Sequence, residues 1–423
     1  MVKRVKKIIY GIPVLLLLAS LSACSAEELL HEVPQTAKLE YEWRDIQEKQ
    51  DLAQDDEKTE QATALQSDGN KTTNSFLSET AYLYAYNCLT EPAQLWYNDM
   101  AVALGKMQET VRLSDAGLEA GLDETCIDRI FQCVLNDHPE LFYVSGYTYT
   151  KYYRGETVVA IEFSGTYELN LDDALVRKQE IEQAAQLILD EIDEAATEYD
   201  KVKYVYDTIV RSTDYDLQAP DNQNIYSVFV GHSSVCQGYA KAAQYLLNRL
   251  GVACTLVQGS VEEGQGHAWN LVKVDGSFYY MDVTWGDASY QAQDGTAIME
   301  AQLPEINYDY LCITTNQLLY THSTDNCVPL PECLDMAANY YVRQGAYFES
   351  YDREQLQQLF QGTLGSGRTD VTVKCADADC FAEIQTALVD NQEIFDYLVN
   401  GKDTIAYASN DKQLSLTFWV TNQ

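Results

Sequence analysis

The sequence predicts an α+β protein of more than one domain. Its 423 residues, 46% of them hydrophobic, are enough to bury a sizeable core. Residues 171–192 have the period of an amphipathic helix, whereas residues 146–153 and 157–165 alternate apolar and polar side chains like paired strands. The two patterns stay mixed along the chain beyond residue 76, which is typical of the α+β class.

The first 24 residues have the pattern of an export signal. A basic start is followed by an apolar stretch too short to span a bilayer comfortably, and then by LSAC at positions 21–24. This ending resembles the lipobox of bacterial lipoproteins, and the resemblance implies that residues 1–23 are removed and that Cys24 is lipidated. We therefore expect an extracytoplasmic protein anchored to the bacterial cell membrane, with an ordinary secretory signal peptide as the alternative.

Composition divides the rest of the chain into four parts. Residues 24–76 are polar and acidic without an apolar period, and we expect them to form a tether that starts at the lipidated cysteine. Three folded parts follow: an N-terminal α+β region at 77–195, a core at 196–330 and a small C-terminal α+β module at 338–423. In the first of them, ETCIDRIFQCVLNDH is expected to be a helix that ends before Pro139.

The charge of the chain argues against nucleic acid as a partner. There are 65 acidic and 28 basic residues, a formal net charge of −37. Such a surface repels phosphate backbones, and no basic stripe interrupts it. We interpret the acidity as a source of solubility.

Eleven cysteines in an exported protein raise the question of disulfides. Setting aside Cys24 and the candidate nucleophile described below leaves nine, an odd number. Cys327 with Cys333, and Cys375 with Cys380, are close enough in sequence to pair, and reduced buried cysteines are the alternative. Neither pair belongs to a C-x₂₋₄-C motif with a matching second half, so we expect no zinc, no other metal and no cofactor.

Cys236 lies where a loop of small residues, GHSS, meets a helical stretch. Tyr239, Ala243 and Leu246 recur at helical spacing after it, and Gly251 marks the end of the stretch. The free N–H groups and the dipole at the start of a helix stabilise negative charge on sulfur, and the charged sulfur is the nucleophile. A structural cysteine at the start of a helix is the alternative.

Two strand-like runs downstream, HAWNLVKV and FYYMDVTW, flank Asp275-Gly276, a dipeptide typical of a two-residue type I′ hairpin loop. In that register Asp282 faces Trp269. His267 lies one step along on the same face, about 7–8 Å away at the backbone. Because a buried carboxylate is costly unless it is paired, the register predicts a hydrogen bond between His267 and Asp282.

These three residue types suit nucleophilic catalysis at a carbonyl group. Cys236 attacks the carbonyl carbon, His267 takes the thiol proton and returns it to the leaving amine, and Asp282 orients the imidazole and stabilises its charged form. The backbone N–H of Cys236 is one candidate donor to the oxyanion, and spacing assigns no second donor.

Three stretches around these residues resemble the core of bacterial transglutaminase-like proteins: SVFVGHSSVCQGYAKAAQYLLNRLGV, GHAWNLVKVDGSFYYMDVTWGD and YDYLCITTNQLLYTH. The resemblance covers about 196–325 and is thinner over LNDHPELFYVSGYTY upstream. It implies a papain-like fold, in which the helix carrying the cysteine packs on an antiparallel sheet. It also implies a catalytic triad of Cys236, His267 and Asp282.

The resemblance suggests further site residues. In the family an aromatic or amide side chain upstream of the cysteine often helps the oxyanion hole, and Tyr226 is the loose counterpart here. Gln237, beside the nucleophile, and Trp269 are candidates for the substrate cleft. Packing in the core is the alternative for Trp269.

The other four histidines lie outside the chemical motifs. His232 is close to Cys236 in sequence, but it has no evident carboxylate partner and is expected to be a solvated loop residue. His138 is expected in a turn, and nothing in the sequence assigns a role to His31 or His322.

Taken with the export signal, the resemblance implies a lipid-anchored thiol acyl-transfer enzyme that acts on amide bonds of peptides or proteins, including those associated with the cell wall. Water or an amine accepts the acyl group, depending on the access of water to the acyl-enzyme, and we favour hydrolysis. One alternative is a catalytically silent binding or scaffold lipoprotein. Another is a sugar-binding surface protein, suggested by the 31 tyrosines.

Overall fold

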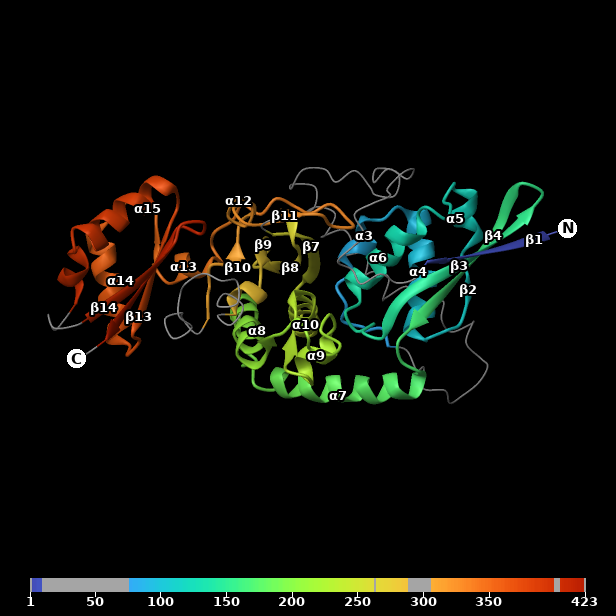
Figure 1. Cartoon of the computed structure of the whole chain (residues 1–423), viewed down its shortest axis with the longest axis horizontal. Coiled ribbons are helices and arrows are strands. Elements are labelled where there is room, and N and C mark those ends of the chain that lie inside the picture. The colour runs from blue at the N-terminus through green and yellow to red at the C-terminus, as the bar shows by residue number, and fades with distance from the viewer. Residues whose placement is uncertain (1, 10–75, 262–263, 288–305, 399–403, 422–423) are drawn as a thin grey trace. The chain divides into compact units, whose positions relative to one another are not determined.

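The computed structural model describes residues 2–9, 76–261, 264–287, 306–398 and 404–421 (Figure 1). The chain forms two compact units. The first comprises Met1–Gln179 and Asn326–Glu332, and the second comprises Glu180–Asp325 and Cys333–Gln423. Cys24 and nearly all of the predicted tether lie outside the described residues. Among the residues that are described, every helix is too short or too polar to span a membrane.

The first unit contains a four-stranded antiparallel sheet. The predicted strand pair is confirmed as β3 (Val144–Arg154) and β4 (Thr157–Tyr167). β2 (Val111–Arg112) pairs with β4, and β1 (Val2–Ile9) pairs with the other edge of β3. We expected residues 1–23 to lie outside the fold, and for β1 the structure differs, because its backbone fills the hydrogen-bonding edge that β3 offers. Cleavage of the signal segment stays a prediction, and it would remove β1 from the mature protein.

Short helices complete this unit: α3 (Tyr84–Cys88), α4 (Glu91–Gly105), α5 (Asp115–Glu119) and α6 (Ile127–Asp137). The predicted end of α6 before Pro139 is confirmed. The last residue of α6, Asp137, is fully buried, and its carboxylate accepts hydrogen bonds from the N–H groups of Ala85 and Tyr86. These bonds fix α3 to the end of α6. The long helix α7 (Leu171–Leu189) crosses the boundary between the units.

The second unit is built around a five-stranded antiparallel sheet of strand order β10-β9-β8-β7-β11. Its strands are β7 (Cys254–Ser260), β8 (Gly266–Val274), β9 (Ser277–Met281), β10 (Leu311–Ile313) and β11 (Ser323–Thr324). The smaller elements around it are α8 (Glu198–Ser212), α9 (Ile225–Phe229), η2 (Thr284–Gly286), α12 (Thr315–Leu318) and the parallel pair β5 (Asp214–Tyr215) and β6 (Ser233–Ser234).

The predicted helix at the cysteine is α10 (Cys236–Arg249), which packs against β7 and β8. It ends at Arg249, and Gly251, just beyond its C-cap, has a φ of 76° that glycine adopts without strain. The Asn270 amide, on β8, donates to the carbonyl oxygen of Ala240 at 2.9 Å and joins the sheet to the first turns of the helix. The antiparallel sheet with a cysteine-bearing helix is therefore confirmed.

The C-terminal module has its own sheet, of strand order β12-β13-β15-β14, in which β12 and β13 are parallel and the other pairs antiparallel. The strands are β12 (Tyr347–Phe348), β13 (Asp370–Cys375), β14 (Thr404–Asn410) and β15 (Ser415–Thr421). The helical elements are α13 (Tyr340–Arg343), α14 (Arg353–Gly365), α15 (Ala378–Gln385), η4 (Thr386–Asp390) and η5 (Glu393–Tyr397). Phe348, Phe360 and Phe418 belong to its apolar core, so the module buries a core of its own.

Candidate active site

Cys236 is the first residue of α10. The residue before it, Val235, has extended backbone angles and is the N-cap, so the first turn of the helix begins at the cysteine. The sulfur side of α10 faces the sheet, where Cys236 packs with Ala240, Leu256 and Ala268 and keeps 8% of its surface exposed. The candidate nucleophile therefore lies at the positive end of a helix dipole, with a small part of its surface exposed.

The β8–β9 hairpin has the predicted register. Asp275 and Gly276 both have positive φ, as a type I′ loop requires, and Val274 pairs with Ser277. The regular pairing ends at Asn270 and Met281, so the next residue, Asp282, leaves the strand. Its backbone N–H instead donates to the carbonyl oxygen of Tyr310 at 3.0 Å.

His267 lies between Cys236 and Asp282. Its Nε2 is 2.7 Å from Asp282 Oδ2, which is the hydrogen bond expected from the hairpin register. A side-chain hydrogen bond also joins the imidazole to the Cys236 sulfur. Because Nε2 faces the carboxylate, the other ring nitrogen, Nδ1, is the one available to the sulfur. The three predicted catalytic side chains are therefore in one continuous chain of contacts.

The Asp282 carboxylate has a second imidazole partner that the sequence interpretation missed. His322 Nε2 is 3.1 Å from Asp282 Oδ2, and His322 is 2% exposed. Nothing in the sequence assigned His322 to the site, and the structure places it in contact with Asp282. The histidine directly precedes β11, which pairs with Gly259 and Ser260 at the end of β7, and this long-range pairing carries it to the site.

The charges of the site support one another. Burial lowers the pKa of His267, but the Asp282 carboxylate and the Cys236 sulfur raise it by more, to about 10. Burial raises the pKa of Asp282, but His267 and His322 outweigh it and hold the pKa well below its usual value. Burial lowers the pKa of His322, and Asp282 offsets that in part, so the pKa of His322 stays below its usual value. At neutral pH the site thus favours a charged His267 beside a neutral His322.

Comparison with known families agrees with this geometry. A model of the transglutaminase-like superfamily matches residues 186–283, which include Cys236, His267 and Asp282. This chain contains a transglutaminase-like domain. His322 lies beyond the matched segment of that domain.

Individual relatives share only part of their length with the chain. Kyphoscoliosis peptidases from Homo sapiens and Mus musculus are each 26% identical over 117 residues, covering 24% of this chain and 18% of the relative. The match therefore spans less than a fifth of the length of these relatives.

Two solved structures are also similar to part of the chain. A TGase crystal structure has a TM-score of 0.24 at 16% identity, covering 33% of this chain and 44% of its own. The periplasmic domain of TgpA from Pseudomonas aeruginosa has a TM-score of 0.20 at 12% identity, covering 34% and 73%. Because these TM-scores are low, the identification of the transglutaminase-like domain rests on the family match.

The three further residues predicted for the oxyanion hole or the substrate cleft, Trp269, Tyr226 and Gln237, have less support from the structure. Trp269 is fully buried, with its ring stacked on His267 at 5.9 Å between centroids, so it packs beneath the site and cannot line an open cleft. The Tyr226 hydroxyl donates to Glu180 Oε2 at 2.8 Å, which directs it to α7. Gln237 is half-buried in the first turn of α10, and its role in the substrate cleft stays a prediction.

Trp285 is a better candidate for the wall of the cleft than Trp269. It is half-buried, its ring centroid is 5.9 Å from that of His267, and its backbone N–H donates to Asp282 Oδ1 at 3.2 Å. The sequence interpretation placed both tryptophans in apolar strands. Instead, Trp285 lies in η2, which begins at Thr284, two residues after Asp282.

His267, Asp282 and His322 are also of the residue types that bind metals, and their ligand atoms lie within 4.8 Å of one another. Hydrogen bonds between these three side chains already explain why they lie close together, however. Each Nε2 is within hydrogen-bond distance of Asp282 Oδ2, and the remaining ring nitrogens face Cys236 and the Thr321 hydroxyl. The arrangement therefore suits proton donors around a carboxylate.

The contacts between cysteines agree with only one of the two pairs that the sequence suggested. In the first unit the side chain of Cys327 hydrogen-bonds to Cys133, while Cys333 belongs to the second unit, so proximity in sequence was a poor guide for Cys327. Cys375 and Cys380 do contact each other through their side chains. All of these cysteines are unbridged in the described structure.

Proposed function

We propose that the chain is a thiol acyl-transfer enzyme that attacks amide bonds of peptides or proteins through Cys236, His267 and Asp282. The observation that carries the proposal is the position of His267, which contacts the sulfur through one side of its ring and a buried carboxylate through the other. A buried histidine held as a cation beside a cysteine at the start of a helix suits a thiolate–imidazolium pair.

In the first half-reaction the Cys236 thiolate attacks the carbonyl carbon, and the carbonyl π electrons move to oxygen. The backbone N–H of Cys236, at the first turn of α10, is placed to donate to that oxyanion. As the oxyanion collapses, the C–N bond breaks and the proton on His267 passes to the amine, which leaves neutral. A thioester and a neutral imidazole remain.

In the second half-reaction His267 takes a proton from the acceptor, which is water or an amine. The acceptor oxygen or nitrogen attacks the thioester carbon, and collapse of the intermediate breaks the C–S bond and restores the thiolate. Asp282 stays ionised throughout, since it stabilises the imidazolium that forms again. Hydrolysis is our preferred outcome, and transamidation is the other.

We also propose that the enzyme works outside the cytoplasm, held at the membrane by lipidated Cys24. The support for this part is the sequence pattern of residues 1–24 alone. Its substrates would then be extracellular or cell-wall peptides. Lipid attachment at Cys24 is testable by the mass of the N-terminal peptide of the purified mature protein.

The test of the nucleophile is a labelling experiment. A peptide amide mimic with a thiol-reactive carbonyl group should label the wild-type protein at Cys236, as identified by peptide mass spectrometry. Cys236→Ala should abolish this label, while Cys88→Ala, which removes a half-buried cysteine of the first unit, should leave it unchanged. Equal labelling of the wild type and Cys236→Ala would exclude Cys236 as the nucleophile and favour a silent scaffold.

A further inference from the structure

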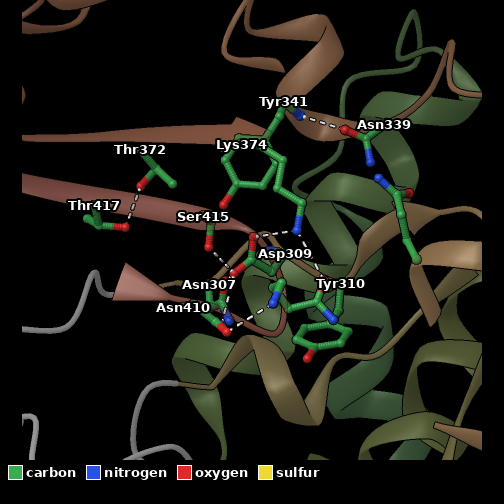
Figure 2. Close-up of polar contacts among 12 residues, drawn as sticks. Asn307, Asp309, Tyr310, Asn339, Tyr341, Thr372, Lys374, Asn410, Ser415 and Thr417 are labelled. Carbon is green, nitrogen blue, oxygen red and sulfur yellow. Dashed lines mark hydrogen bonds and ion pairs between the residues drawn. The ribbon is translucent and has the colours of Figure 1, made fainter. Parts of the chain in front are cut away.

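The C-terminal module meets the transglutaminase-like core through a buried polar cluster (Figure 2). Lys374, on β13, is 3% exposed, and its ammonium group lies 3.1 Å from the Asp309 carboxylate of the core. Ser415, on β15, donates to the other oxygen of Asp309 at 2.8 Å. Because buried charges are tolerated when their hydrogen bonds are satisfied, this cluster fixes one arrangement of the module on the core.

The same cluster continues to the catalytic carboxylate. Lys374 Nζ also lies 3.1 Å from Gln413 Oε1, and Gln413 Nε2 is 3.5 Å from the hydroxyl of Thr321. That hydroxyl is 2.8 Å from His322 Nδ1, and His322 Nε2 is 3.1 Å from Asp282 Oδ2. Four hydrogen bonds thus lead from a lysine of the module to the carboxylate that holds His267.

The direction of these bonds is fixed at both ends. An ammonium group can only donate, so the Gln413 amide oxygen faces Lys374 and its NH₂ group faces Thr321. At the other end an ionised carboxylate can only accept, so the bond to Asp282 forms only while His322 carries its proton on Nε2. In a neutral His322 with that proton, Nδ1 is an acceptor for the Thr321 hydroxyl. The Leu318 carbonyl oxygen, which also hydrogen-bonds to the ring, favours the protonated form instead. The Tyr310 hydroxyl, 3.4 Å away, lies at the remaining side of the Thr321 oxygen.

We propose that the C-terminal module is a working part of the active site: through Gln413 and Thr321 it keeps His322 in the tautomer that donates to Asp282. His322 is then a positioning residue that acts through the carboxylate. In the other tautomer a bare Nε2 would face the carboxylate and push it away from His267. The expected effect on the reaction rate rests on the proposed function, whereas the expected tautomer of His322 does not depend on it.

The test compares two threonine-to-valine substitutions, each of which removes a hydroxyl and keeps the shape of the side chain. Thr321→Val removes the group that faces His322. Thr417→Val is the matched control, because Thr417 pairs with Thr372 at 2.9 Å within the module (Figure 2). Gln413→Met is a second variant, which keeps Thr321 and breaks the link to the module. Circular dichroism checks that each variant is folded.

The first readout is the ¹⁵N spectrum of the histidine rings, which distinguishes the two neutral tautomers. We expect His322 as the Nε2–H form in the wild type and in Thr417→Val, and a mixture of tautomers in Thr321→Val and Gln413→Met. A wild-type His322 protonated on Nδ1 would overturn the proposal, as would an unchanged His322 signal in both folded test variants.

The second readout is the rate at which the Cys236 probe reacts. Loss of one neutral hydrogen bond should slow the reaction about tenfold in Thr321→Val and leave Thr417→Val unchanged. If the wild type does not react with the probe at all, the proposed function fails while the ring spectrum still decides the tautomer. If the tautomer changes but the rate does not, the module has no part in the chemistry and the proposal is wrong.

Discussion

His267 is the residue on which the proposed chemistry of the site depends. It is buried between the Asp282 carboxylate and the Cys236 sulfur, which together raise its pKa to about 10. The carboxylate in turn is held by His322 and by the backbone N–H of Trp285, so its orientation does not depend on His267 alone. A charged group with this many fixed partners is costly to disturb, since removing one partner leaves the others buried and unpaired.

Asp282→Asn tests this charge balance, because it keeps the shape of the side chain and removes its charge. The pKa of His267 should fall from about 10 toward its usual 6.5, as followed by NMR titration of the ring. The free energy of unfolding should fall by about 3–5 kcal/mol, the cost of breaking a buried ion pair. Asp275→Asn is the matched control, since Asn-Gly suits the type I′ loop equally well.

The loss of stability in Asp282→Asn should depend on pH. The raised pKa of His267 contributes stability that is complete below pH 6.5 and is lost as the pH rises through about 10. The lowered pKa of Asp282 contributes stability that is complete above pH 3.8 and is lost as the pH falls toward its folded value. Urea unfolding should therefore show the largest difference between wild type and variant from about pH 4 to pH 6.5. A difference that grows from pH 7 to pH 10 would contradict the assignment.

The helix α10 and the β8–β9 hairpin bring the site together, and each depends on local sequence features. Gly238, in the first turns of α10, lies against the β6 loop, and a Cβ at this position would be 2.0 Å from Ser234 Oγ. Ser234 is itself held by the Ser227 hydroxyl and the Asn222 carbonyl oxygen, so it has little freedom to move. The glycine of the CQGY stretch therefore allows the loop before Cys236 to pack closely on the helix.

Gly238→Ala should lower the free energy of unfolding by roughly 1–3 kcal/mol, because it overpacks this contact. The matched control is Gly362→Ala in the middle of α14, where a Cβ would meet open space. That substitution should raise the stability by about 0.5–1 kcal/mol, as expected for alanine in a helix. Thermal unfolding of both variants measures the contrast. Equal effects at the two positions would mean that the loop at Ser234 does not restrain α10.

The hairpin could be predicted from the sequence because its register depends on a local signal, the Asp275-Gly276 loop. His322 could not be predicted in the same way. It reaches Asp282 through the pairing of β11 with β7, two short segments far apart in the chain, and no local pattern marks that pairing. The resemblance quoted for YDYLCITTNQLLYTH ended at this histidine, which was the available signal.

At the scale of the whole molecule, the second unit joins the transglutaminase-like core and the C-terminal module in one compact body. The sequence indicated the two modules, because each has its own pattern of strands and helices. Their junction was beyond sequence reasoning, since Lys374, Gln413 and Asp309 are scattered polar residues with no shared motif. We expect that a truncated chain without the module loses a structural support of the candidate active site as well as a domain.

The central claim is that Cys236 and His267 act as one ion pair, and the rate of Cys236 alkylation by iodoacetamide across pH tests it most directly. Peptide mass spectrometry follows the reaction at Cys236 in the wild type and in His267→Ala. We predict that wild-type Cys236 stays reactive at pH 6, where an ordinary thiol with a pKa of about 8.5 is mostly protonated, and that His267→Ala loses this reactivity. A wild-type rate that is negligible at pH 6, or equal in the two proteins, would contradict the account.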